Sequence, residues 1–210
     1  MARALFTVTI LTSAMITSCA SVNPLASMTP TKEIVKSYQI YDIKGADKLS
    51  PTQLSEAIKV ALQKDVTGIT VTNDLPPHPL PEQAGRFQLS NPFEGSAIGA
   101  LAATSGQSLE IASCKGSIMQ ASASNDSMAS HGESANFTVC LWPYKDGYHL
   151  DFYSAFTKSS GGFSAEALGD SLARSIVGDS SQSIPKTIDD VLTSVKGTGV
   201  TVSLVEKYPG

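Results

Sequence analysis

An Asp-Gly pair between two alternating segments constrains the fold of this 210-residue chain more than any other feature. Residues 136–144 and 148–157 both alternate apolar and polar side chains, which is the period of a β-strand. Asp146 and Gly147 lie between them, and such a pair favours the tight turn of a hairpin. The chain is therefore expected to build an antiparallel sheet around this hairpin.

The register of the hairpin decides which side chains share a face. A two-residue loop at the Asp-Gly pair aligns Lys145 with Tyr148 and Leu141 with Phe152. One face then carries only apolar side chains: Phe137, Val139, Leu141, Leu150, Phe152 and Phe156. A three-residue loop would mix apolar and polar side chains on both faces, and register normally follows the cleaner burial pattern. We therefore expect the two-residue loop.

The opposite face of the hairpin carries three aromatic side chains and two titratable ones: Trp142, Tyr144, His149, Asp151 and Tyr153. Large aromatic groups with a polar tip are typical of recognition surfaces, so this face is a candidate binding site. A half-exposed sheet face, or one covered by a loop, would carry the same strand-favouring residues. His149 and Asp151 also point the same way, as an acid/base pair would, but the sequence places no third group beside them.

A helix is expected to begin at Pro51. Ser50 precedes it as an N-cap and Gln53 completes a capping box. Apolar residues then recur at four-residue spacing and form one narrow stripe: Leu54, Ile58 and Leu62. The helix should end before Gly68, with this stripe packed on the sheet.

Two further helices are expected in the last third of the chain. Ser164 caps the first, which has a four-spaced apolar stripe and stops at Gly178. Pro185 opens the second, which ends at Gly197.

Other strands are expected on both sides of the hairpin in sequence. They cover residues 37–43, 69–71, 87–89, one long or bulged strand over 109–122, and 200–204. The proline-rich segment 74–85 should be an extended loop, which contains His78. Residues 94–108 fit either a loop or a short helix. The polar tract 124–134, with His131, should be a loop.

This order of elements predicts an α+β fold: a single layer of mostly antiparallel sheet, with about three helices on one face. Residues 37–210 would form the one domain, and the face with Phe137 and Leu150 would meet the helices. No phosphate-binding glycine motif follows a strand, and no internal repeat is present.

The first eighteen residues indicate secretion. Arg3 makes the start positive, and residues 4–16 are apolar and uncharged, too short to cross a hydrocarbon core of roughly 30 Å as a helix. This pattern is typical of a signal peptide over residues 1–18.

The segment Ile16, Thr17, Ser18 and Cys19 resembles the lipobox of bacterial lipoproteins. The resemblance implies that the Cys19 thiol receives a diacylglyceryl group, that the signal peptide is removed, and that the new amine is acylated with a chain such as palmitate. Ala20 stands where Asp would retain many such proteins in the inner membrane, so the resemblance implies the outer membrane. Residues 19–36 would be the lipidated cysteine and a tether.

Lipidation of Cys19 leaves Cys114 and Cys140 as an even pair. Disulfides persist outside the cytoplasm, so these two are expected to be bonded. A free buried pair, a metal pair or a nucleophile are the alternatives. No CxxC spacing exists, and the chain holds only three histidines, so no metal site is predicted.

The charge balance disfavours nucleic acid as a partner. The chain has 19 acidic and 15 basic residues, a net charge of −4, without a basic block. The lipobox resemblance implies a lipid-anchored protein of the outer membrane that faces the periplasm. We expect it to be a binding or accessory component of the cell envelope, with an envelope protein or cell-wall partner and without enzymatic activity, catalytic residues or a cofactor. The alternative is a hydrolase acting on envelope material through His149 and Asp151.

Overall fold

The structure is a computed structural model. It describes residues 31–45, 49–91, 93–97, 99–100, 110–125, 135–160 and 180–209. The expected signal peptide, Cys19 and the first part of the tether lie outside these residues. So do the helix expected from Ser164 to Gly178 and the loop that contains His131.

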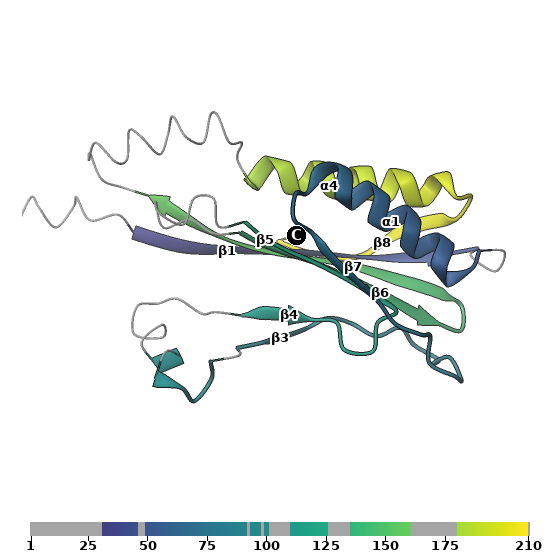
Figure 1. The fold of residues 1–210 in the computed structure, drawn as a ribbon, viewed down its shortest axis with the longest axis horizontal. Helices are drawn as coiled ribbons and strands as arrows, with labels where there is room; N and C mark the ends of the chain where they lie inside the picture. Colours follow the sequence, from purple (N-terminus) through teal and green to yellow (C-terminus); the bar gives the residue numbers. More distant parts are fainter. Residues whose placement is uncertain are drawn as a thin grey trace, which may run out of the picture.

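A six-stranded antiparallel sheet forms the body of the described molecule (Figure 1), in the order β2-β5-β6-β7-β1-β8. Its strands are β1 (Thr31–Lys44), β2 (Thr70–Asn73), β5 (Met119–Asn125), β6 (Ala135–Tyr144), β7 (Gly147–Ser160) and β8 (Thr201–Tyr208). Every neighbouring pair in it is antiparallel. The expected α+β class with an antiparallel sheet is confirmed. Strand β1 begins six residues earlier than expected, inside the segment interpreted as a tether.

Two long helices, α1 (Pro51–Asp65) and α4 (Ser180–Gly197), lie side by side on one face of this sheet (Figure 1). About three were expected. The capping box at Ser50 and Gln53 is present as predicted. Helix α4 starts before the expected Pro185, which lies inside its first turns. Neither helix of the described chain is long and apolar enough to cross a bilayer.

The core between the helices and the sheet, called the first core here, contains the predicted apolar stripe of α1. Leu54, Ile58 and Leu62 are fully buried there. The apolar hairpin face meets them through Val139, Leu141, Leu150 and Phe152, which are also fully buried. Helix α4 adds Ile188, Val191, Leu192 and Val195. The predicted division of the hairpin into two faces is therefore confirmed.

The register of the hairpin differs from the expected one by two residues. Leu141 pairs with Leu150 and Tyr144 with Gly147, so the turn residues are Lys145 and Asp146. A type I′ turn centred on Asp146 would need positive φ there, and no described residue other than glycine has positive φ. Gly147 instead begins β7. A shift of two keeps every side chain on its face, because side chains alternate with a period of two.

The expected long strand over residues 109–122 is two strands in two sheets. Strand β4 (Ile111–Ser113) pairs with β3 (Gln88–Ser90) in a small second sheet, while β5 belongs to the large one. A tight turn separates them, in which Ser117 N–H donates to the Cys114 carbonyl at 2.9 Å. Gly116 supplies the positive φ of 91° that this turn uses.

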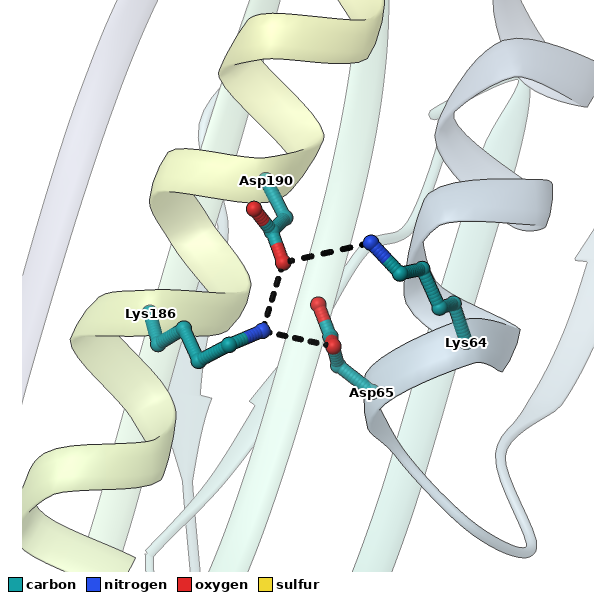
Figure 2. A network of polar contacts seen from close by, with 4 residues as sticks. All are labelled: Lys64, Asp65, Lys186 and Asp190. Atoms are coloured by element: carbon teal, nitrogen blue, oxygen red, sulfur yellow. Dashed lines mark hydrogen bonds and ion pairs between the residues drawn. The ribbon is translucent and has the colours of Figure 1, made fainter.

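An ion-pair network joins the end of α1 to the side of α4 (Figure 2). Lys186 Nζ donates to Asp65 Oδ1 at 2.9 Å and to Asp190 Oδ2 at 2.6 Å, and Lys64 Nζ lies 3.9 Å from Asp190 Oδ2. These bonds raise the pKa of Lys186, the bond to Asp190 most. Both lysines are well exposed, so the network contributes little to stability.

Candidate functional site

The face of the sheet opposite the helices holds a second buried cluster, called the second core here: Ile40, Phe87, Ala112, Cys114, Cys140, Trp142, Tyr153 and Ala155. Strands β3 and β4 lie across this face (Figure 1), and residues 84–87 lead into β3. We call residues 84–90 and 110–114 the cover. The candidate binding face of the hairpin therefore lies against the cover.

Trp142 shows how closely the cover sits on this face. The indole is 5 % exposed. A Cβ built on Gly85 would lie 2.3 Å from its Cε3 atom, so only glycine allows the chain to pass over the ring at this distance. Tyr153 is 2 % exposed and Tyr144 is 9 % exposed. Trp142 and Tyr153 therefore match the alternative of a covered sheet face, while Tyr144 is buried outside the second core.

A disulfide joins Cys114 of the cover to Cys140 of β6, as predicted from the cysteine count. Cys140 lies on the same face as Trp142, and both sulfurs are buried in the second core. The bond links the small sheet covalently to the large one. Neither cysteine is therefore free to act as a nucleophile or a metal ligand while it is bonded.

Asp151 is a buried carboxylate beneath the cover, 1 % exposed. Its Oδ2 accepts the Phe87 N–H at 3.0 Å. Burial raises its pKa to about 6, against smaller lowering effects of the Phe87 hydrogen bond, the Arg86 charge and Trp142. Its other oxygen and the Trp142 indole N–H make no hydrogen bond of normal geometry, although the indole lies near enough to lower that pKa. These two polar atoms and the Tyr153 hydroxyl are the buried unpaired atoms of this side of the sheet among the described residues.

His149 does not join Asp151. Its Nε2 lies 3.9 Å from Asp42 Oδ1, and burial lowers its pKa more than Asp42 raises it. The Tyr144 hydroxyl donates to the same Asp42 oxygen at 2.6 Å, and Lys44 donates to that hydroxyl. No hydrogen bond or ion pair between His149 and Asp151 exists in the structure. The five candidate residues thus divide into a buried group and a partly exposed group at the rim.

Two cover residues were not singled out by sequence reasoning. Arg86 forms a forked ion pair with Glu206 of β8 at 2.6 and 3.0 Å, and it lies over the rings of Tyr38 and Phe87. Phe87 packs edge-on against Tyr38 and tilted against Tyr153. The sequence signal was only a short apolar alternation after a proline-rich loop, which does not tell which face it covers.

The histidines and carboxylates of the described residues do not gather into a metal site. No group of three His, Cys, Asp or Glu side chains with ligand spacing occurs among them. His78 is exposed in the extended loop between β2 and β3, where no strand forms, as predicted for residues 74–85. Comparison of the chain with family models, curated proteins and solved structures found no match.

Proposed function

We propose that this chain is a lipid-anchored lipoprotein of the outer membrane, facing the periplasm, whose domain serves the cell envelope as a binding or accessory component rather than as an enzyme. One observation carries the proposal. Because the disulfide uses Cys114 and Cys140, Cys19 is the one cysteine of the chain that this bond leaves over. A disulfide-bonded domain after a lipobox fits an oxidising compartment outside the cytoplasm.

The proposed anchor has a clear energetic basis. Each acyl CH₂ buried in lipid contributes about 0.8 kcal/mol, and two chains already give stable attachment. Strand β1 starts at Thr31, so about a dozen residues separate Cys19 from the sheet. As a flexible coil they would span roughly 20 Å. The domain would therefore work close to the membrane surface.

The separation of His149 from Asp151 supports binding over catalysis. An acid/base pair needs both groups within hydrogen-bond reach of a substrate. Asp151 is closed off under the cover and occupied by the Phe87 N–H, while His149 faces Asp42 at the rim. The hydrolase alternative has no comparable geometric support among the described residues.

The anchor is tested by replacing Cys19. In a Cys19→Ala variant we expect metabolic labelling with a palmitate analogue to be lost and the protein to leave the membrane fraction. The control is the Cys114→Ala, Cys140→Ala double variant, which should stay labelled and membrane-bound. Labelling that persists without Cys19 would refute the anchor.

The proposed location in the outer rather than the inner membrane is tested by replacing Ala20. An Ala20→Asp variant should move from the outer-membrane to the inner-membrane fraction in a Gram-negative host with unchanged palmitate labelling. Crosslinking in living cells followed by mass spectrometry should then join the wild type to envelope proteins or glycan. Crosslinks confined to cytoplasmic proteins would contradict the proposed location.

A further inference from the structure

A pocket of about 250 Å³ lies on the sheet face opposite the helices, beside the second core. It is formed where β2, β5, β6 and β7 run under the start of β4. Its polar side chains are Thr70, Glu110, Ser122, Ser124, Asn136, Thr138 and Tyr153. Among the described residues of its wall there is no lysine, arginine or histidine.

The sheet register puts most of these groups in line. Thr70 pairs with Ser122, Ser122 with Thr138, and Thr138 with Tyr153. Directly paired residues project to the same face of a sheet, so four hydroxyl side chains form one row across four strands. Ser124 and Asn136 are paired in the next row on that face. The floor of the pocket is thus a set of neutral donors and acceptors.

Tyr153 marks this row as incomplete. Its side chain is 2 % exposed, and its hydroxyl is buried without a hydrogen-bond partner. A buried hydroxyl is normally paired, because leaving it unpaired costs free energy. Burial and then the Glu110 charge raise the pKa of Tyr153 to about 12, so its hydroxyl lies within the field of the Glu110 carboxylate, which is itself a wall of the pocket. Because the hydroxyl is closed to solvent, a ligand in the pocket would become its partner by displacing the wall around it.

Glu110 stands at the edge of the pocket with its charge already compensated. One of its carboxylate oxygens pairs with Lys36 of β1, which lies outside the pocket wall. Among the described residues, Lys36 is the hydrogen-bond partner of this carboxylate, which leaves its other oxygen to accept a hydrogen bond. Within the described wall, an anionic ligand would meet this carboxylate and no cation, and a cationic ligand would have to compete with Lys36.

From this geometry we propose that the pocket binds one ring of a neutral, polyhydroxylated ligand, a saccharide unit. Sugar hydroxyls both donate and accept, as do the hydroxyls of the row. The volume is below the roughly 300–1,000 Å³ of pockets for drug-sized ligands, which suits a single ring. The inference deepens the proposed envelope function and rests on it for the source of the ligand, a glycan of the envelope.

The experiment uses the full chain, purified with its disulfide formed. Glucose and N-acetylglucosamine are titrated separately and binding is followed by saturation-transfer NMR. We expect saturable binding of at least one sugar. Tyr153→Phe, which removes only the unpaired hydroxyl, should weaken it by about tenfold, the effect of one lost hydrogen bond. Tyr148→Phe, on the face that meets the helices, should bind as the wild type does.

Ser122→Ala removes another hydroxyl of the row and leaves the core unchanged, and it should also weaken sugar binding. It tests the pocket even if Tyr153→Phe does not fold. Failure of both sugars to bind overturns the inference, as does undiminished binding by both variants. Saturable binding of inorganic phosphate or spermidine, with no sugar binding, overturns it in favour of a charged ligand.

The sugar titration and the Cys19 experiment fail independently. A labelled, membrane-bound protein that binds neither sugar leaves the lipoprotein proposal standing and removes the saccharide pocket. A protein that binds sugar but is unlabelled at Cys19 removes the lipoprotein proposal instead.

Discussion

The first core, between the sheet and the two helices, is mainly apolar, with Ser55 and Thr187 of the helices also buried. The second core surrounds Asp151 and the polar tips of Trp142 and Tyr153. The first is sealed by helices of 15 and 18 residues. Two strands of three residues each and a short connecting segment seal the second. The same sheet therefore supports one core stabilised mainly by apolar burial and one that depends more on specific links.

The second core is held by specific links where the first relies on burial. The disulfide ties the cover to β6, and the forked Arg86–Glu206 pair ties it to β8. Buried polar atoms without partners lower the stability that this core can contribute. The comparison predicts that changes in the first core threaten the whole fold, while changes in the second loosen the cover.

The largest effect is expected from Phe152→Ala. Phe152 is 1 % exposed and contacts the rings of Tyr41 and Phe137. Its removal should lower the free energy of unfolding by about 3–5 kcal/mol, measured by urea denaturation. Phe87→Ala in the second core is the matched change, and we expect a smaller loss because the cover can settle into the space. Equal losses would break the distinction between the cores.

Loss of the disulfide comes next. Cys114 and Cys140 are separated by 26 residues, and opening a loop of that size should cost about 3 kcal/mol of stability. In the double alanine variant, hydrogen exchange should become faster in β3 and β4 while α1 stays protected. Wild type with its disulfide reduced is the control, and its hydrogen exchange should match that of the double alanine variant. Faster exchange in α1 alone would show that the bond supports the other core.

The pH dependence of stability isolates Asp151. Its pKa rises from 3.8 unfolded to about 6 folded, so the folded state holds a proton that the unfolded state has released. Stability from this group is complete below pH 3.8 and is lost as pH rises to about 6, by about 2–3 kcal/mol. Asp151→Asn keeps an oxygen for the Phe87 N–H and should remove this loss. Urea unfolding of both proteins at pH 4 and pH 8 measures this loss of stability. An Asp151→Asn variant that is no more stable than wild type at pH 8 would contradict the assignment to Asp151.

The smallest effect tests the contact between cover and indole. Gly85→Ala would place a Cβ 2.3 Å from Trp142 and should cost about 1–3 kcal/mol as the cover is pushed away. Tryptophan fluorescence should shift toward that of an exposed indole. Gly197→Ala is the matched control, since no atom lies within 4 Å of its added Cβ. If both variants are equally stable, the close contact between Gly85 and the Trp142 indole is contradicted.

The helix-covered half of the fold followed from local patterns. The capping box at Ser50, the stripe of α1 and the alternation of the hairpin each depend on neighbours in sequence, and the structure confirms all three. The turn residues were misplaced because an Asp-Gly pair fits more than one turn. The break between β4 and β5 was missed because one glycine in an alternating segment reads equally as a bulge.

The candidate site was harder to predict for a physical reason. Alternation tells which residues share a face of a sheet, but not what covers that face. Trp142, Tyr153 and Asp151 share a face as predicted, yet a segment some sixty residues earlier in the chain encloses them. The hydroxyl row from Thr70 to Tyr153 joins four strands, so no local window of the sequence contains it.

The sequence by itself determined the antiparallel α+β class and the two faces of the hairpin, because both follow from residue spacing. The pairing of Cys114 with Cys140 followed from the cysteine count once the lipobox resemblance had set Cys19 aside. Only the tertiary structure decided that the aromatic face is a second core, that His149 and Asp151 have different partners, and that a hydroxyl-lined pocket lies beside them. Those features arise from contacts between segments far apart in the chain, which local periodicity cannot specify.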